Sequence, residues 1–249
     1  MTKQSGLGDQ LFISGVDIGA DINAISNLST PRETLPATNI TQSAMARMFG
    51  KRDGAAEFIA YFNDDAASTH VTLKALPRTD VQLMYLRGTT LGNWGIGMVG
   101  KQINYDPNRA DDGSFLFTVS AQANAKGIDW GRQLTAGKIS HTAAANGSSV
   151  DLGTGSLSFG WQAYLQVFSF TGTSCTVTLQ ESSDNAVGDP FAAITGGAFT
   201  AATGVTVQRL ESSSATATVE RYVRIVTSGT FSECSFAVLF TRNEALRAL

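Results

Sequence analysis

Hydrophobic and polar residues alternate along much of this chain, with the period of two that is typical of half-buried β-strands. The pattern is clearest in residues 114–125. There Phe115, Phe117 and Val119 fall on one face, and Thr118 and Ser120 fall on the other. Because similar runs recur between clusters of Gly, Asn, Asp and Ser, the chain is expected to be mainly β.

The first half of the chain is expected to hold several strands and one clear helix. Asn63, Asp64 and Asp65 offer an N-cap and an acidic first turn for that helix, which should end before Pro77. The expected strands of this half are 10–20, 57–62, 81–88, 94–105 and 115–125.

Two segments between these elements lack a strand pattern. Residues 23–41 contain Pro31 and Pro36 among many Asn, Ser and Thr, and are expected to form a long connection. A connection of this length in a compact domain is usually functional or reaches a partner. Residues 41–49 are expected to form a short helix, capped by Thr41 and ended by Gly50.

The second half is expected to be a separate all-β unit. Residues 1–145 carry 13 basic and 13 acidic side chains, whereas residues 146–249 carry five Arg, eight acids and no Lys. We therefore expect a domain at 1–142, a linker at 143–149 and a second domain at 150–249. The first is predicted to be a β-sandwich or open barrel with one packed helix, and the second a jelly-roll or immunoglobulin-like sandwich. Its expected strands are 161–170, 173–180, 205–210, 219–226 and 234–241.

Composition and charge narrow the class of protein. The net charge of −3 and the pI near 5.4 argue against a protein that grips nucleic acid, which needs clustered Lys and Arg. No apolar run reaches the 18 residues of a membrane span, and the first ten residues lack the apolar stretch of a secretory signal. Synthesis is therefore expected to end in a reducing cytoplasm. Cys175 and Cys234 alternate with apolar residues and are expected to be buried thiols, with a disulfide as the alternative.

Little in the sequence points to chemistry. Gly95, Gly97 and Gly100 match a dinucleotide fingerprint, but the residues that follow alternate like a strand, so close packing is the better interpretation. An Asp- and Asn-rich turn at 106–112 resembles a calcium loop but has Phe117 where a bidentate Glu is required. His70 and His141 have no evident catalytic partners. The sequence predicts no enzyme, no metal site and no cofactor.

One surface is unusual because it carries hydroxyls and amides but no charge. It could be a plain outer surface, or a surface past which a polyanion slides without binding, since basic side chains would hold phosphates. The residues expected to face such a channel are Gln102, Asn104, Thr118, Ser120, Gln122 and Asn124.

The first 140 residues resemble the tail tube proteins of long-tailed bacteriophages (siphophages). The resemblance rests on the order of the elements and on a set of stretches, none of which is diagnostic alone. These stretches are 21–27, 45–54 leading into 55–63, 76–81, 83–88 and 127–134.

The resemblance implies a virion protein, assembled in the bacterial host cytoplasm, that forms stacked hexameric rings around a channel for genome ejection. Each subunit would lend strands to a shared inner barrel, which removes free sheet edges. Its partners would be further copies of itself, the tape measure, tail terminator and distal tail proteins, and DNA in transit, but no membrane. The N-terminal arm and residues of 23–41 would reach neighbouring subunits. The candidate contacts are Asn23, Ile25, Leu28, Pro31, Arg32, Leu35 and Ile40.

The second unit is similar to sandwich domains appended to phage structural proteins, with 220–225 and 235–242 resembling closing strands. Decoration of the tube exterior is the first interpretation. Weak binding of host-surface glycans through Trp161, Tyr164 and Tyr222 is a second hypothesis, and its alternative is that each of the three is a buried core aromatic. A capsid decoration protein and a host-surface binding tail module are the alternative functions.

Overall fold

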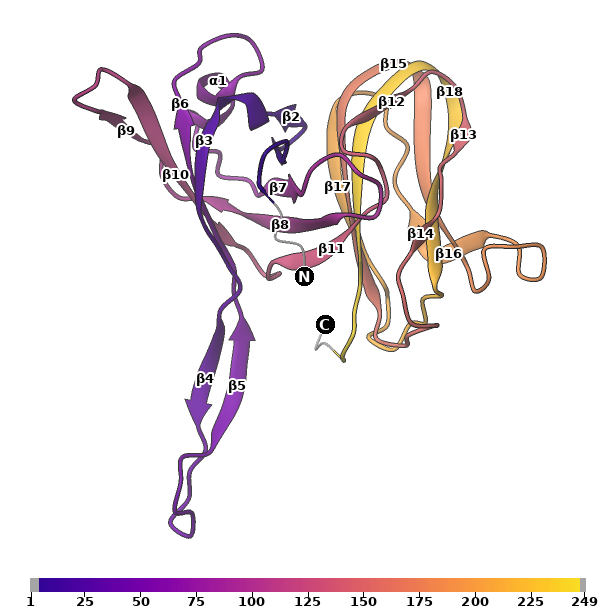
Figure 1. The fold of residues 1–249 in the computed structure, drawn as a ribbon, viewed down its shortest axis with the longest axis horizontal. Coiled ribbons are helices and arrows are strands. Elements are labelled where there is room, and N and C mark those ends of the chain that lie inside the picture. Colours follow the sequence, from indigo (N-terminus) through magenta and orange to yellow (C-terminus); the bar gives the residue numbers. More distant parts are fainter. Residues whose placement is uncertain (1–4, 247–249) are drawn as a thin grey trace. The chain divides into compact units, whose positions relative to one another are not determined.

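The computed structural model describes residues 5–246, which form two compact units (Figure 1). The sandwich unit comprises the described parts of 1–19, 82–97 and 129–249. The hairpin unit comprises 20–81 and 98–128. Every strand pairing is antiparallel, and the single α-helix of the described chain is short. The N-terminal residues that were expected to reach neighbouring subunits include 1–4, which lie outside the described residues.

Two long, bent strands organise the sandwich unit. β15 (Trp161–Ser182) and β18 (Tyr222–Arg242) pair along their whole length. Each was expected as two shorter strands, but both strands bend without breaking, at Gly172 and Gly229, and the register shifts on either side of Gly172. Both glycines have a positive φ, and a Cβ at either would collide with the facing strand, so only glycine fits this bend.

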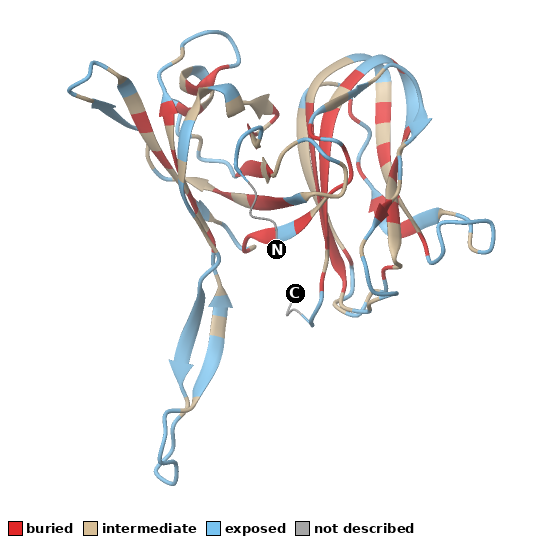
Figure 2. Cartoon of the chain, in the orientation of Figure 1, coloured by how far each residue is buried: buried red, intermediate tan, exposed pale blue. Residues whose placement is uncertain are grey.

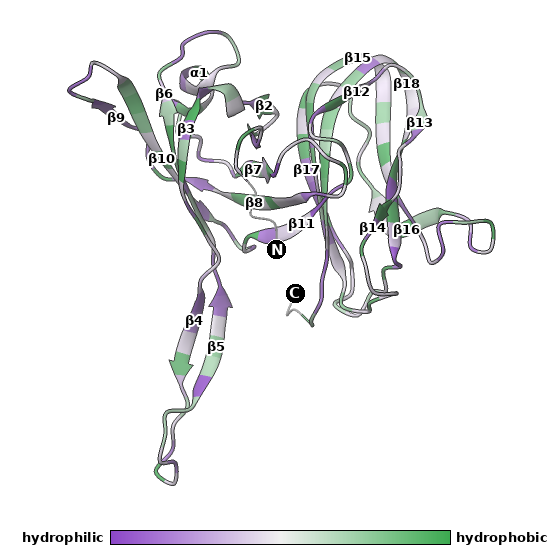
Figure 3. Cartoon of the chain, in the orientation of Figure 1, coloured by the Kyte–Doolittle hydropathy of each residue, from purple (hydrophilic) through white to green (hydrophobic). Residues whose placement is uncertain are grey.

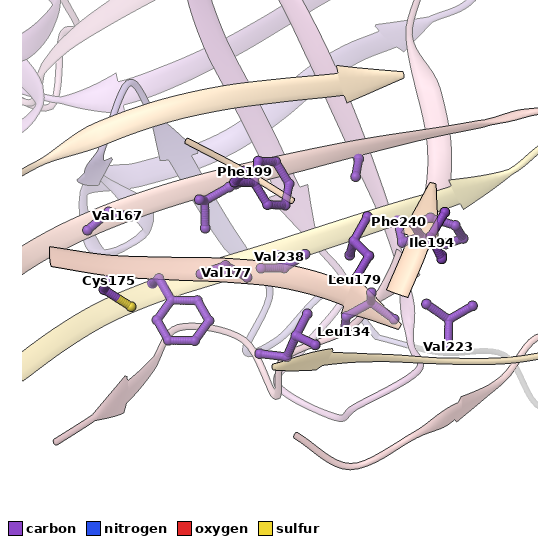
Figure 4. Close-up of a cluster of buried hydrophobic side chains, with 14 of the residues drawn as sticks. Leu134, Val167, Cys175, Val177, Leu179, Ile194, Phe199, Val223, Val238 and Phe240 are labelled. Carbon is purple, nitrogen blue, oxygen red and sulfur yellow. The ribbon is translucent and has the colours of Figure 1, made fainter. Parts of the chain in front are cut away.

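The bend folds the two halves of this pair over one apolar core (Figure 4). Leu165, Val167 and Phe236 come from one half, and Cys175 and Val177 from the other. The outer edges are completed by β16 (Ala192–Ala198) and β17 (Thr206–Glu211) on β15, and by short strands on β18. These short strands are β12 (Ile139–His141), β13 (Ala145–Asn146) and β14 (Val150–Asp151).

A second layer covers the other face of β15. It contains β1 (Gln10–Ile13), β2 (Val16–Asp17), β7 (Val81–Leu86), the first part of β8 (Trp94–Gln102) and β11 (Asp129–Gln133). Residues 161–167 are therefore all buried, because both of their faces are covered. The buried Gln166 side chain accepts a hydrogen bond from Gly15 N at 2.9 Å and donates to Gln82 O at 3.1 Å.

The glycines of the fingerprint-like motif permit this layering. A Cβ on Gly97 would lie 2.5 Å from the Tyr164 ring, and one on Gly95 would lie 2.8 Å from Leu239. β8 can therefore approach β15 and β18 only because these positions have no side chain. This agrees with the interpretation of the motif as close packing.

The hairpin unit contains the strands β3 (Ile22–Ser29), β6 (Ala55–Tyr61), β10 (Phe115–Ala123) and β9 (Asp106–Arg109), with the end of β8 on β10. A 3₁₀ turn (Gly19–Asp21) precedes β3. The helix α1 (Thr69–Leu73) buries Leu73, and is shorter than the sequence indicates because its cap is Ser68. Phe58, Phe117 and Val119 form the buried face of the sheet.

Two local predictions are wrong. Residues 23–41 are not an irregular connection, because they contain β3 and β4 (Arg32–Pro36). Residues 41–49 contain no helix; they hold a turn and the start of β5 (Arg47–Arg52), which pairs with β4. The predicted linker 143–149 contains β13, and the division into domains at 1–142 and 150–249 stays a prediction.

Candidate functional site

The hairpin of β4 and β5, with its connecting turn, is exposed along almost its whole length (Figure 2). Leu35 and Met48 lie directly opposite each other on one face, and Phe49 pairs with Thr34. Phe49 is 74% exposed, Met45 66% and Met48 57%. Figure 3 shows apolar and polar positions interspersed along β4 and β5. We call residues 31–52 the arm.

The arm is ordered by its own local bonds, although its apolar side chains are exposed. At the turn, Thr41 N and Oγ1 both donate to Asn39 Oδ1, at 3.0 and 2.7 Å. The Arg32 guanidinium lies 5.3 Å from the Phe49 ring centroid. An isolated two-stranded hairpin is marginal in water, so an apolar hairpin of this kind is stabilised when another surface covers it.

The arm also differs in charge from the rest of the chain. It carries four basic residues, Arg32, Arg47, Lys51 and Arg52, against Glu33 alone, for a net charge of +3. Because the whole chain has a net charge of −3, the remainder carries −6. A surface that covers the arm is therefore expected to be apolar and acidic.

The two outer strands of the hairpin unit differ in whether their free edge can pair with another chain. β9 is short and contains Pro107 and charged residues, which discourage pairing with another chain. β3 has eight residues and no charge, and among the described residues it pairs only with β6. Two register shifts in β3 interrupt the edge, but the neutral edge remains a template for strand addition.

The residues expected to contact neighbouring subunits are distributed over β3 and the arm. Asn23, Ile25 and Leu28 belong to β3, whereas Arg32 and Leu35 belong to β4. Pro31 lies between the two strands, and Ile40 at the turn is fully exposed. Met45, Met48 and Phe49 were missed because residues 41–49 were assigned to a helix. The signal that could have found them is the run of large apolar residues directly after an Asn- and Thr-rich turn.

The six residues expected to face a channel do not share one face. Thr118, Ser120 and Gln122 alternate on β10 opposite the buried Phe117 and Val119. Gln102 pairs with Ala121 and therefore belongs to the opposite, apolar face, where its amide donates to Leu73 O at 2.8 Å. Its inclusion in the polar set was wrong, because the cross-strand register decides the face.

Asn104 and Asn124 lie just outside the strands. Asn104 Oδ1 accepts a hydrogen bond from Ser120 N at 2.6 Å, and Asn124 Nδ2 donates to Asp80 Oδ1 at 2.9 Å. Both side chains therefore have partners near the polar face of β10.

The polar face is not free of charge, as the single-strand pattern suggested. Glu57 pairs with Ser120, Lys101 with Gln122, and Asp106 with Thr118. The Lys101 ammonium is neutralised by Asp80 at 2.6 Å. The face thus presents two acids and one paired base, which repels a polyanion as well as failing to bind it.

A carboxylate outside the helix completes the N-terminus of α1. Asp21 Oδ2 accepts hydrogen bonds from Thr69 N at 3.2 Å and Thr69 Oγ1 at 2.5 Å, and Asn63 Nδ2 donates to Oδ1. Burial raises the pKa of Asp21, but these hydrogen bonds outweigh it, so the pKa lies below its ordinary value. Next to it, His70 Nδ1 lies 2.9 Å from the hydroxyl of Tyr105, whose pKa is raised to about 12 by burial.

A buried polar network in the sandwich unit went unpredicted. Tyr164 donates to Asp129 Oδ2 at 2.5 Å and accepts from Arg209 Nε at 3.1 Å. Arg209 also bonds Asp129 at 3.4 Å and Glu211 at 2.8 Å. Burial raises the pKa of Tyr164 far above its ordinary value, so the phenol stays neutral. The network joins β11, β15 and β17, and the paired charges make it a structural clasp.

The residues proposed to touch glycans are mostly unable to do so. Trp161 and Tyr164 are fully buried, because both faces of this part of β15 are covered. Tyr222 is half-buried, with the Arg221 guanidinium 4.9 Å from its ring centroid. The hypothesis in that form is therefore wrong for Trp161 and Tyr164.

The two cysteines are free and buried, as expected. Their thiols form a hydrogen bond that, with burial, raises the pKa of Cys234. His141 lies 3.0 Å from Thr227 Oγ1, and burial lowers its pKa. Within residues 5–246, no cluster of three His, Cys, Asp or Glu side chains could hold a metal ion. None of the helices in that range is long and apolar enough to cross a membrane.

Fold and surfaces together define an antiparallel β protein whose exposed hairpin has an apolar character. No protein-family model matches the chain, and no curated protein matches it. Among solved structures, the tail of an empty gene transfer agent particle with C6 symmetry is similar over 50% of this chain and 96% of its own, at 13% identity and a TM-score of 0.40.

Two further structures are similar over most of the chain. The Dit protein of phage SPP1, described as a paradigm of the hub adsorption apparatus, is similar over 94% of this chain and 98% of its own, at 12% identity and a TM-score of 0.34. The baseplate of phage p2 in its activated conformation is similar over 96% and 99%, at 10% identity and a TM-score of 0.36. Because these likenesses are distant, the function proposed below stands on the residues of this chain.

Proposed function

We propose that this chain is a structural subunit of a phage-type tail. It assembles with copies of itself into rings, which are hexameric by the sequence resemblance, and the rings stack into a tube through which DNA leaves the virion. The role is structural and not catalytic. The observation that carries the proposal is the arm, an ordered hairpin whose large apolar side chains are exposed.

The arm and the edge of β3 would make different contacts in such an assembly. The neutral edge of β3 would pair with a strand of the neighbouring subunit in the same ring, which closes the sheet into a shared barrel. The arm would lie on a neighbouring copy, where its basic residues meet the acidic remainder of the chain.

The polar face of β10 is the surface that would line the channel. Thr118, Ser120 and Gln122 offer hydroxyl and amide groups, and the neighbouring Glu57 and Asp106 add negative charge. A lining without free Lys or Arg releases DNA, because phosphates find no cation to replace their counterions.

The proposal is tested by placing charge on the arm. Phe49→Glu and Met48→Glu are expected to leave the protein folded but monomeric, since both side chains are exposed in the single chain and would be buried in the assembly. Val187→Glu is the matched control, because Val187 is 93% exposed in a loop of the sandwich unit. Sedimentation velocity gives the mass of each variant. Assemblies of unchanged size in both arm variants would overturn the proposal.

A further inference from the structure

A cavity in the sandwich unit has no role in the proposed assembly. It has a volume of about 460 Å³ and lies at the start of β8, along β11 and at the end of β18. Its lining includes Trp94, Trp130, Arg132, Arg242 and Glu244. Its size falls within the range of small-molecule sites, which are mostly apolar and aromatic with a few polar groups that fix the ligand.

Two tryptophans form one wall of this cavity. Trp94 pairs with Arg132 across β8 and β11, and Trp130 lies two residues before Arg132, so the three side chains share one face of this strand pair. Trp94 and Trp130 are each 45% exposed, whereas Trp161 is 1% exposed. The Arg132 guanidinium lies 3.7 Å from the centroid of the Trp94 ring, so it covers one face of this indole and holds the ring in place.

The polar groups of the cavity are of two kinds. Arg242 is fully engaged, because it donates hydrogen bonds to the carbonyls of Leu152, Thr154, Gly155 and Glu220 and so holds the rim. Arg132 donates to Gly92 O at 3.1 Å and has no further acceptor among residues 5–246 that the structure records. A guanidinium has five N–H donors, so Arg132 has donors to spare, and Glu244 adds an exposed carboxylate.

We infer that this cavity binds a saccharide through Trp94, Trp130 and Arg132. The C–H face of a sugar ring packs on an indole, while its hydroxyls accept hydrogen bonds from the guanidinium and donate to the carboxylate of Glu244. An apolar ligand would leave these charged groups unpaired, which costs binding free energy. Nucleic acid is a poor fit, because Arg242 is used by backbone carbonyls and Glu244 places a carboxylate in the same lining as Arg132.

The test uses the three tryptophans of the full chain. Acrylamide quenching of their fluorescence is measured while methyl glucoside, methyl N-acetylglucosaminide or methyl glucuronide is added. A binding sugar is expected to protect Trp94 and Trp130, with the buried Trp161 as an internal reference that does not change. Stronger protection by the glucuronide than by the neutral glycosides would show that Arg132 binds the carboxylate of the sugar.

Two substitutions make the assignment specific. Arg132→Met is expected to weaken sugar binding by about tenfold or more, because a hydrogen bond from a charged donor is lost. Arg221→Met is the matched control, since Arg221 is an exposed arginine elsewhere in the same unit, paired with Asp151. Trp130→Phe keeps an aromatic wall of smaller area and is expected to bind more weakly.

Three results would overturn the inference. The first is no protection by any of the three glycosides. The second is protection that persists unchanged in both Arg132→Met and Trp130→Phe. The third is protection that follows protein concentration without sugar, which would make this face a contact between copies. None of these results bears on whether the arm drives assembly, so the two proposals fail separately.

Discussion

At the scale of single residues, the chain places its buried charges where several strands meet. Asp129 is buried, and Arg209 is the cation that compensates it, at 3.4 Å. Tyr164 lies between them and bonds both. A buried ion pair adds little net stability, but removing one partner leaves a buried charge that costs much. The contribution of this network to the free energy of unfolding should therefore be measurable when one partner is removed.

Arg209→Met is therefore expected to lower the free energy of unfolding by about 3–5 kcal/mol, since it removes the cation beside the buried Asp129 carboxylate. Arg221→Met is the comparison, because both side chains of the Arg221–Asp151 pair are largely exposed and an exposed ion pair adds little to stability. Urea unfolding followed by tryptophan fluorescence measures both. Equal losses in the two variants would contradict the assignment of the network as a clasp.

At the scale of elements, the sequence predicted strands that have one buried face and missed the strands that are exposed on both faces. β6, β10 and the second half of β15 alternate because one face is buried, and their positions were predicted within a few residues, whereas β16 was not predicted. β4 and β5 are exposed on both faces, so no period of two marks them, and 41–49 was assigned to a helix from its capping residues alone. Trp161 and Tyr164 stayed among the glycan candidates beside the alternative of burial, because a strand that is buried on both faces has no polar side that marks its orientation.

The close approach of β8 to β15 depends on the glycines of β8, and this dependence can be tested. Gly97→Ala is expected to destabilise the protein by about 1–3 kcal/mol, because its Cβ would meet the Tyr164 ring and force the layer apart. Gly155→Ala is the matched control, since a Cβ there has no atom within 4 Å and its φ is not positive. Thermal unfolding compares the two. A Gly97→Ala variant as stable as Gly155→Ala would show that β8 does not need the close approach.

At the scale of the whole molecule, charge and exposure are divided in a way that suits self-assembly. A basic arm of +3 belongs to a chain whose remainder carries −6, and the neutral edge of β3 contrasts with the blunted edge of β9. Screening acts strongly on exposed charges, so contacts made by the arm are expected to weaken as salt is raised. The edge pairing, which relies on backbone hydrogen bonds, should be less sensitive.

Electron microscopy of the purified full-length protein at high concentration tests the central claim most directly. The account predicts closed rings with a central hole that stack into hollow tubes, and predicts that Phe49→Glu abolishes them while Val187→Glu does not. Particles that stay monomeric at every concentration, or compact assemblies without a channel, would contradict it.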